Sequence, residues 1–218
     1  MPLYKTLSLN NSTTLLIWKV SETEEELSKG LTLSSFDKDK LKKLKRKEHR
    51  KSFWAVRQLL KHLKITENDF YYTSKGKPIL CNNKHLSISH TKNYVAVIVS
   101  DRPIGVDVEH QSDKLNLVAN KYLNMEENMY LSSTQNILAS LSVIWGVKEA
   151  VFKIYGGLIP LSFKNDIQVY PFTWKKQGQT QVKVCVDASS EVIYPVLFFE
   201  VALGVTCVVV GESLFKNS

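Results

Sequence analysis

One alternating stretch decides the fold: Ile104-Gly105-Val106-Asp107-Val108-Glu109. Its alternation predicts a β-strand, because successive side chains of a strand point to opposite faces. One face would be apolar and able to pack on a core, whereas the other would carry Gly105 and the carboxylates of Asp107 and Glu109. Two carboxylates held this close repel each other unless a cation lies between them. The stretch therefore predicts either a divalent-metal site or, as the plainer alternative, a half-exposed edge strand with solvated acids.

Length and charge limit the class of protein. The 218 residues are enough for one large domain or two small ones with a substantial core. Lys and Arg number 29 against 21 Asp and Glu, and the resulting charge of +8 favours a polyanionic partner. Nucleic acid, nucleotide phosphates, an anionic membrane and an acidic protein all satisfy that condition, so charge alone does not choose among them.

The cysteines and the apolar segments indicate a soluble protein in a reducing compartment. Cys81, Cys185 and Cys207 are odd in number and widely spaced, which argues against a disulfide framework or a zinc site. The most apolar segment, 192–210, is interrupted by a proline, a glutamate and a glycine. It is predicted to form two β-strands rather than a membrane span. We therefore expect a cytoplasmic protein without membrane contact.

A long helical pattern is predicted from about residue 37 to residue 64. Lys and Arg crowd the outer faces of its segment 38–57, so a nucleic-acid-binding module is the competing function, although no base-reading motif accompanies them. Arg50 and Arg57 lie seven residues apart near the apolar stripe, where a guanidinium is suited to bind a phosphate. The sequence does not choose between these two arginines.

The remaining periodicities predict both strands and helices. Leu86 to His90 alternates and is followed by a run of β-branched residues, which predicts two neighbouring strands. A helix is expected over about 136–155, ended by Gly156-Gly157 as a C-terminal cap. The segment 163–210 alternates in short runs and predicts an antiparallel sheet, with a hairpin turn at Gly178.

A second motif lies within the helix predicted for 136–155. It reads Trp145-Gly146-Val147-Lys148-Glu149-Ala150-Val151-Phe152-Lys153. The core stripe of this helix is expected to consist of Ile144, Val147, Val151 and Ile154. On another face, Trp145, Glu149 and Lys153 recur every four residues. The plain alternative is a surface ion pair between Glu149 and Lys153, worth roughly 0.3–0.5 kcal/mol and without function.

Together, the two motifs resemble those of the 4′-phosphopantetheinyl transferases. The chain length and the upstream segments resemble the surfactin-type group of this family, which holds two similar subdomains in one chain. Lys75-Gly76-Lys77-Pro78 and Ser87-Ile88-Ser89-His90 are similar to that group's Gly-Lys-Pro and Ile-Ser-His segments. The resemblance covers about residues 50–161. One departure is Gly146, where the family commonly has Ser or Thr.

The resemblance implies a magnesium-dependent transfer of the phosphopantetheine arm of coenzyme A to a serine of an apo carrier protein, with release of adenosine 3′,5′-bisphosphate. Asp107, Glu109 and Glu149 would hold Mg²⁺ against the pyrophosphate of coenzyme A. Lys153 would neutralise a phosphate oxygen. Glu149, directly or through a water molecule, would also accept the serine proton.

The resemblance also implies contacts outside the catalytic group. The residues that would bind the phosphates of coenzyme A are Lys77, Ser89, His90 and Arg50. Glu127, or alternatively Glu126, matches an acidic position near the metal. For Lys148, both a phosphate contact and a structural role are compatible with its place beside Glu149.

The fold implied by the resemblance is an α+β protein of two similar tandem subdomains related by a pseudo-twofold axis, each a small antiparallel sheet packed on a long helix. Subdomain 1–103 would bind coenzyme A through its basic helix, subdomain 104–218 would carry the metal-binding carboxylates, and the coenzyme A cleft would lie between them. We expect a monomer whose partner is an acidic carrier protein, and nucleic acid is the less favoured partner. The sequence does not indicate which carrier is used, or whether free or acylated coenzyme A is preferred.

Overall fold

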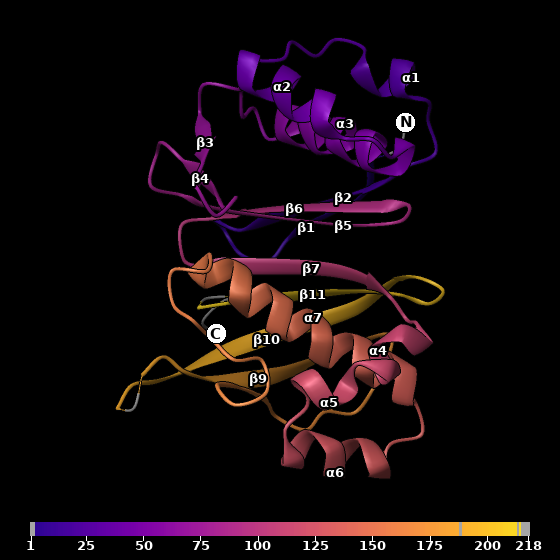
Figure 1. Ribbon diagram of the computed structural model, residues 1–218, viewed down its shortest axis with the longest axis vertical. Coiled ribbons are helices and arrows are strands. Elements are labelled where there is room, and N and C mark those ends of the chain that lie inside the picture. Colours follow the sequence, from indigo (N-terminus) through magenta and orange to yellow (C-terminus); the bar gives the residue numbers. More distant parts are fainter. Residues whose placement is uncertain (1–2, 188, 213, 215–218) are drawn as a thin grey trace. The chain divides into compact units, whose positions relative to one another are not determined.

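The computed structural model describes residues 3–187, 189–212 and 214 of the chain (Figure 1). The chain divides into two compact units, Met1–Asp101 and Arg102–Ser218. Each unit combines helices with antiparallel strands. The predicted α+β class is therefore confirmed as a mixture of helices and antiparallel sheets.

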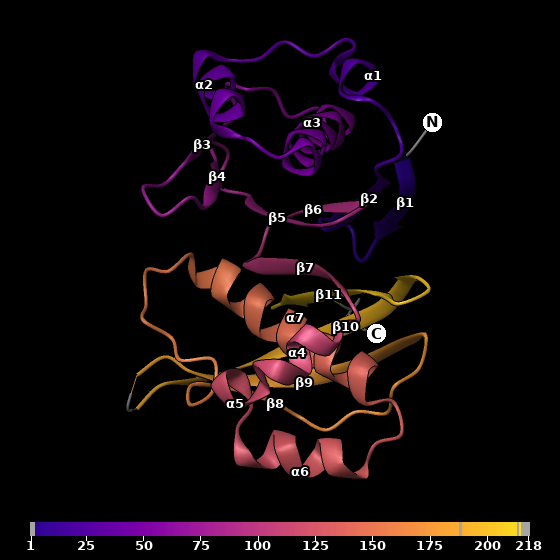
Figure 2. The same ribbon diagram turned by 45° about the vertical axis from the view of Figure 1, so that its right-hand side comes forward.

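The first unit contains a four-stranded antiparallel sheet covered by helices. In spatial order its strands are β1 (Leu3–Ser8), β2 (Thr14–Lys19), β6 (Tyr94–Ser100) and β5 (His85–Thr91). Three helices lie together on one face of this sheet (Figures 1 and 2): α1 (Glu24–Ser28), α2 (Ser35–Lys43) and α3 (Lys47–His62). Between α3 and β5 the chain forms a separate short pair, β3 (Phe70–Tyr72) and β4 (Pro78–Leu80).

The core of the first unit lies between α3 and the sheet. Its buried apolar side chains include Leu16, Val56, Leu60, Leu86 and Val97. They recur with the helical period on α3 and with period two on the strands, so each element contributes one apolar face. The strands predicted from the alternation at 86–90 and from the run that follows it are confirmed as β5 and β6.

The prediction of a single long helix over residues 37–64 is wrong, because the segment forms two helices. Leu44 and Arg46 adopt extended conformations, so α2 and α3 are separate helices. The interruption allows Asp37 of α2 to form a bidentate ion pair with Arg57 of α3, in which both side chains are buried. In one continuous helix these two residues would lie about 30 Å apart, because each residue adds about 1.5 Å. The ion pair therefore requires the break.

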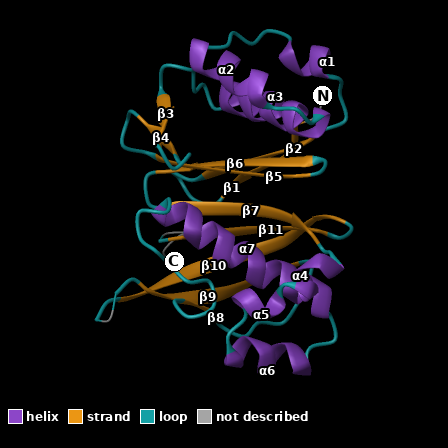
Figure 3. Cartoon of the chain, in the orientation of Figure 1, coloured by secondary structure: helices purple, strands orange, loops and turns teal. Residues whose placement is uncertain are grey.

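The second unit contains a five-stranded antiparallel sheet and its own long helix (Figure 3). In spatial order its strands are β7 (Ile104–His110), β11 (Val205–Gly211), β10 (Glu191–Ala202), β9 (Gln177–Cys185) and β8 (Ile167–Val169). Between β7 and β8 the chain forms the helices α4 (Asp113–Leu117), α5 (Ala119–Tyr122), α6 (Met125–Ser133) and α7 (Ile137–Tyr155).

Helix α7 confirms the helix predicted for 136–155. Its stripe residues Ile144, Val147 and Val151 are buried in the core of the second unit. The helix ends at Gly156, whose φ of 62° and ψ of 26° are left-handed, as a glycine C-terminal cap requires. Neither α7 nor any other helix within the described residues combines the length and apolar character needed to cross a membrane.

The hairpin turn predicted at Gly178 is wrong, because Gly178 lies inside β9. It stands opposite Phe198 of β10, and a Cβ atom at residue 178 would lie 2.4 Å from the Phe198 ring. This glycine is therefore required by side-chain packing rather than by chain reversal. The connection between β8 and β9 is instead the segment 170–176.

We predict that Asp37→Ala lowers the free energy of unfolding by about 3–5 kcal/mol, because it leaves the Arg57 guanidinium buried without its carboxylate. Urea denaturation followed by tryptophan fluorescence measures the change. Asp39→Ala is the matched control, since it removes a carboxylate of the same helix from an exposed pair with Lys42. That variant should differ from the wild type by less than about 1 kcal/mol.

The double variant Asp37→Ala/Arg57→Met tests whether the loss comes from the stranded charge. It removes both charges of the pair and should recover much of the stability lost in Asp37→Ala. If the double variant were less stable than Asp37→Ala by the full cost of a second core substitution, the two side chains would not be coupled.

Candidate active site

Helix α7 packs closely on the sheet at two glycines. A Cβ atom at Gly105 of β7 would lie 2.0 Å from the carbonyl oxygen of Ala150. A Cβ atom at Gly146 of α7 would lie 2.9 Å from the Val208 side chain and 3.5 Å from Asp107 Oδ2. The helix therefore covers the face of β7 that carries Gly105 and Asp107, rather than the apolar face of that strand. The limited space also explains why Gly146 has no hydroxyl-bearing side chain.

This packing brings Lys153 of α7 to Asp107 of β7. The Lys153 ammonium donates to Asp107 Oδ1 at 2.7 Å and to the carbonyl oxygen of Val106 at 3.0 Å. Asp107 is 6% exposed, so the alternative of a solvated acid on a half-exposed strand does not hold for it. A surface ion pair between Glu149 and Lys153, the plain alternative, is not what the structure shows. Lys153 instead connects helix α7 to strand β7.

Glu149 lies close enough to this ion pair to be influenced by it. Burial raises the pKa of Glu149 above its ordinary value, and the Asp107 carboxylate adds to the rise. The Lys153 ammonium opposes the shift, whereas Glu109 reinforces it. The four side chains predicted to carry the chemistry therefore form one electrostatic group in the second unit.

The chemistry of this group fits a hard divalent cation. Three carboxylates supply only oxygen ligands, which is the type of ligand that Mg²⁺ prefers. A cation would also favour the ionised form of Glu149, whose pKa is raised by burial and by its neighbours. In the described part of the chain, no three His, Cys, Asp or Glu side chains are gathered closely enough to hold an ion as they stand. Coordination would therefore require the carboxylate side chains to move together.

Lys148, next to Glu149 in the sequence, is completely buried. Its ammonium lies 2.6–2.8 Å from four oxygens, those of the Tyr122, Phe163 and Ile167 carbonyls and Glu127 Oε2, which surround its three N–H groups. Burial lowers the pKa of Lys148, while the Glu127 carboxylate opposes that shift. Of the two roles compatible with its sequence position, the structure gives Lys148 the structural one.

Glu127 belongs to the same buried network. Its Oε2 accepts from the backbone N–H of Asn124 at 3.0 Å, which closes a capping box at the start of α6, and its Oε1 accepts from Val169 at 2.9 Å. Glu126, by contrast, is exposed. The Asn-x-x-Glu spacing at 124–127 is a helix-capping signature, so this role could have been found from the sequence.

The residues predicted to bind coenzyme A phosphates lie in the first unit. Strand β5 places His90 and Ser89 on opposite faces, so His90 is exposed whereas Ser89 is buried. Lys77 lies in the turn that leads into β4 and is half-buried. That burial lowers the pKa of Lys77, because it disfavours the charged form, and a bound anion would raise it again.

Both arginines considered for a phosphate contact have acidic partners within the first unit. Arg50 Nε donates to the two carboxylate oxygens of Glu24 at 3.1 and 2.9 Å. Arg57 is 7% exposed and donates to both carboxylate oxygens of Asp37, so its guanidinium is less accessible than that of Arg50. Both arginines stay predictions.

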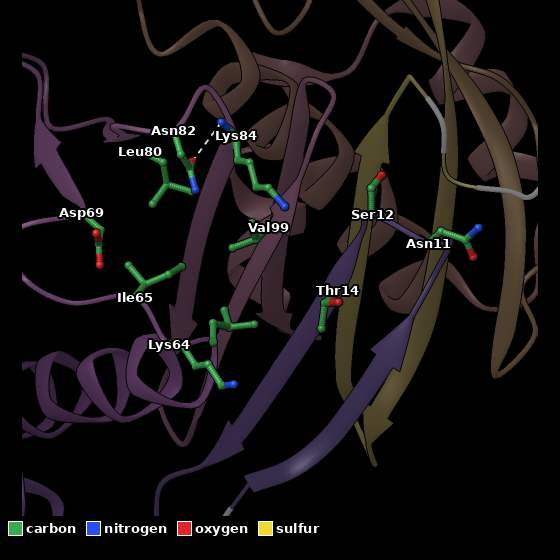
Figure 4. A pocket seen from close by; sticks show the side chains of 11 residues that line it. Asn11, Ser12, Thr14, Lys64, Ile65, Asp69, Leu80, Asn82, Lys84 and Val99 are labelled. Carbon is green, nitrogen blue, oxygen red and sulfur yellow. Dashed lines mark hydrogen bonds between the residues drawn. The ribbon is translucent and has the colours of Figure 1, made fainter.

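A surface cavity of about 340 Å³ also opens within the first unit (Figure 4). None of the residues predicted to bind phosphate lines it. Its polar lining includes Asn82 and Lys84, and the backbone N–H of Lys84 donates to Asn82 Oδ1 at 3.2 Å. The Lys84 ammonium pairs with Asp101 at 3.3 Å. The cavity therefore does not coincide with the group of residues that the sequence singled out.

Comparison with known proteins identifies the segment that contains the carboxylates. Residues 103–192 match the 4′-phosphopantetheinyl transferase superfamily, and this segment includes all of β7 and α7. The chain is also similar to the 4′-phosphopantetheinyl transferase gsp of Aneurinibacillus migulanus, at 27% identity over 127 residues, which are 57% of this chain and 49% of that relative. The match thus spans about half the length of the curated relative. Residues 103–192 are thus similar to the 4′-phosphopantetheinyl transferase superfamily, the family that the two motifs resemble.

Proposed function

We propose that the protein transfers the 4′-phosphopantetheine arm of coenzyme A to a serine of an apo carrier protein. The observation that carries this proposal is the electrostatic group formed by Asp107, Glu109, Glu149 and Lys153. It lies inside the segment that matches the superfamily. The name of the similar protein, a 4′-phosphopantetheinyl transferase, supports the same reaction.

The carboxylates of Asp107, Glu109 and Glu149 would hold Mg²⁺. When bound, that ion supplies positive charge against the oxygens of the pyrophosphate. Lys153 would supply a second positive charge, directed at a phosphate oxygen on which negative charge develops during the transfer. Its position beside Asp107 keeps the ammonium in the group before substrate arrives.

The transfer replaces one phosphorus–oxygen bond by another. The serine oxygen bonds to the phosphorus that carries the pantetheine arm, the pyrophosphate bond to that phosphorus breaks, and adenosine 3′,5′-bisphosphate leaves. Glu149, directly or through a water molecule, accepts the proton of the serine hydroxyl. Burial and the neighbouring carboxylates raise the pKa of Glu149 above its ordinary value, and a carboxylate of higher pKa is a stronger proton acceptor.

The first unit would bind the phosphates of coenzyme A through Lys77, Ser89, His90 and Arg50. This unit holds the whole basic excess of the chain, with 19 Lys and Arg against 10 Asp and Glu, whereas the second unit has 10 against 11. Such a surplus attracts a substrate with several phosphates and an acidic carrier protein alike.

We propose that the protein acts as a monomer.

The order of strands supports two similar subdomains. In the first unit, β2 is followed by the long helix α3 and by the hairpin β5–β6, whose second strand pairs with β2. In the second unit, β7 is followed by the long helix α7 and by the hairpin β10–β11, whose second strand pairs with β7. The two spatial orders, β2-β6-β5 and β7-β11-β10, therefore correspond element by element.

We predict that an apo carrier protein incubated with the protein, coenzyme A and Mg²⁺ gains the mass of the phosphopantetheine arm, as measured by mass spectrometry. Glu149→Gln should slow this gain by roughly 10²–10⁴-fold at saturating Mg²⁺, because it removes the proposed proton acceptor. Raising Mg²⁺ should restore only part of the rate, since mass action refills a weakened metal site but does not replace a base.

Glu191→Gln is the control for this experiment, because it neutralises an exposed carboxylate of the same unit. It should leave the rate close to that of the wild type. Full recovery of Glu149→Gln at high Mg²⁺ would remove the base role. If the wild-type protein left every carrier unmodified but bound a random oligonucleotide tightly, the nucleic-acid-binding alternative would replace the proposal.

We further predict that Lys153→Met binds Mg²⁺ or Mn²⁺ more tightly than the wild type when coenzyme A is absent. The ammonium occupies Asp107 Oδ1 at 2.7 Å, so a metal ion must compete with it for a ligand. An ion pair of this partial exposure is worth up to about 1 kcal/mol, which corresponds to a several-fold gain in affinity. Isothermal titration calorimetry measures the affinity without any turnover.

Lys183→Met is the matched control for Lys153→Met, because it removes an ammonium from an ion pair with Glu191 in the same unit. Its metal affinity should equal that of the wild type. Added metal should also raise the unfolding temperature of Lys153→Met by more than that of the wild type. Weaker metal binding by Lys153→Met would contradict the competition and would place the metal ligands elsewhere.

A further inference from the structure

The surface cavity of the first unit is bordered by two turns with an unusual backbone (Figure 4). Among the described residues, the two non-glycine residues with a positive φ are Lys64, at 57°, and Asn83, at 61°. Lys64 lines the cavity. Asn83 stands in the chain between two further lining residues, Asn82 and Lys84. Such conformations disfavour residues that have a Cβ atom, and they concentrate at functional sites. Their coincidence at one cavity therefore indicates a binding site.

Lys64 occupies a position at which glycine is usual. Helix α3 ends in a Schellman motif, in which the N–H of Lys64 donates to the Lys61 carbonyl at 3.0 Å. In the same motif, the N–H of Ile65 donates to the Leu60 carbonyl at 2.9 Å. The left-handed residue of such a motif is most often glycine. The sequence instead places a lysine there, and its ammonium has no hydrogen-bond or ion-pair partner among the described residues. The strained position therefore presents a positive charge that the protein itself does not use.

A second ammonium lies on the opposite side of the cavity. In Figure 4 the Lys84 side chain lies above the cavity and the Lys64 side chain lies below it. The Lys84 ammonium pairs with Asp101 at 3.3 Å, but both side chains are about half exposed. Such a pair contributes little to stability, so a bound anion is able to compete with Asp101. Two ammonium groups that border one space suit a dianion, which accepts a charge-assisted hydrogen bond from each.

Asp69 supplies an acceptor at a third side of the cavity (Figure 4). Its Oδ2 accepts from the backbone N–H and from the hydroxyl of Thr66, both at 2.7 Å. The backbone bond, and after it the hydroxyl bond, lowers the pKa of Asp69, so the carboxylate is ionised at neutral pH. An ionised carboxylate repels an anion but accepts a hydrogen bond from a hydroxyl group. The lining thus favours a ligand with an anionic end and a hydroxyl-bearing end.

We propose that this cavity binds a small phosphorylated polyol, with the phosphate between Lys64 and Lys84 and a hydroxyl group donating to Asp69. A phosphate monoester is close to a dianion at neutral pH and presents three strong acceptor oxygens. The volume of about 340 Å³ lies at the lower end of the range for small-molecule sites. The inference goes beyond the proposed transfer. Lys84 directly precedes β5 and His90 lies near its other end, about 20 Å further along the strand.

The test titrates the protein with glycerol 3-phosphate, inorganic phosphate and glycerol, and measures binding by ligand-detected NMR. Glycerol 3-phosphate should bind most tightly, phosphate should bind several-fold more weakly, and glycerol should not bind detectably. Lys64→Met and Lys84→Met should each weaken glycerol 3-phosphate by roughly 5- to 20-fold, the usual effect of one charge-assisted hydrogen bond. Lys45→Met is the matched control, because it removes an exposed lysine of the same unit that does not line the cavity. It should bind like the wild type.

Two further variants separate ligand contacts from folding. Asp69→Asn keeps an acceptor oxygen for Thr66 but removes the charge. It should weaken glycerol 3-phosphate and leave phosphate unchanged or more tightly bound, because a repulsive carboxylate is gone. Lys64→Gly should lose affinity as Lys64→Met does. Without ligand it should nevertheless unfold about 2–4 °C higher than the wild type, because glycine adopts the left-handed conformation without strain.

Several results would overturn the inference. Glycerol 3-phosphate that does not bind saturably to the wild type, or that binds equally well after both lysine substitutions, would rule out the cavity as its site. Displacement of glycerol 3-phosphate by coenzyme A would place the ligand in the proposed transfer site instead. Wild-type affinity in Lys64→Gly would leave the lysine at this strained position without a role in binding. The proposed function survives all of these results, since it fails only if no carrier is modified.

Discussion

The close approach of α7 to β7 at Gly105 is the contact on which the second unit depends. A Cβ atom at residue 105 would lie 2.0 Å from the Ala150 carbonyl oxygen, so any side chain there would push the helix away from the strand. The same approach sets the 2.7 Å distance between Lys153 and Asp107. Packing and chemistry are therefore determined together, because the groups proposed to act on phosphate are carried by the two elements that this glycine brings together.

A second constraint fixes the rotation of α7 about its own axis. The Lys148 ammonium is buried among four oxygens, and leaving it there without them would cost several kcal/mol. Successive helical residues differ by about 100° in direction. Once Lys148 points into the core, Glu149 must point to a neighbouring side of the helix, where Asp107 and Lys153 influence its pKa. The buried pair of Lys148 with Glu127 thus orients Glu149, the proposed base, from inside the core.

Local patterns in the sequence predicted the elements, and contacts between distant residues decided where they end. Helix α7, its glycine cap and strand β7 follow from spacing alone, because each depends on near neighbours in the chain. The break between α2 and α3 does not, because it depends on Asp37 meeting Arg57. The hairpin turn predicted at Gly178 is wrong for the same reason, because the glycine is needed to make room for Phe198 on another strand.

The candidate site follows the same rule. The sequence indicates which residues belong to the site, but not which side chains they contact. Like-charge repulsion predicts that Asp107 and Glu109 need a cation, and the resemblance to the transferases adds Glu149 to them. The i,i+4 spacing predicts Lys153 beside Glu149. The structure directs that ammonium to Asp107 instead, because the buried carboxylate is the costlier one to leave without a counter-charge. One ammonium among three carboxylates still leaves an excess of negative charge, so the protein compensates its own site only in part. That remaining charge is what a divalent cation would neutralise, and it explains why the carboxylates are not gathered more closely by the protein alone.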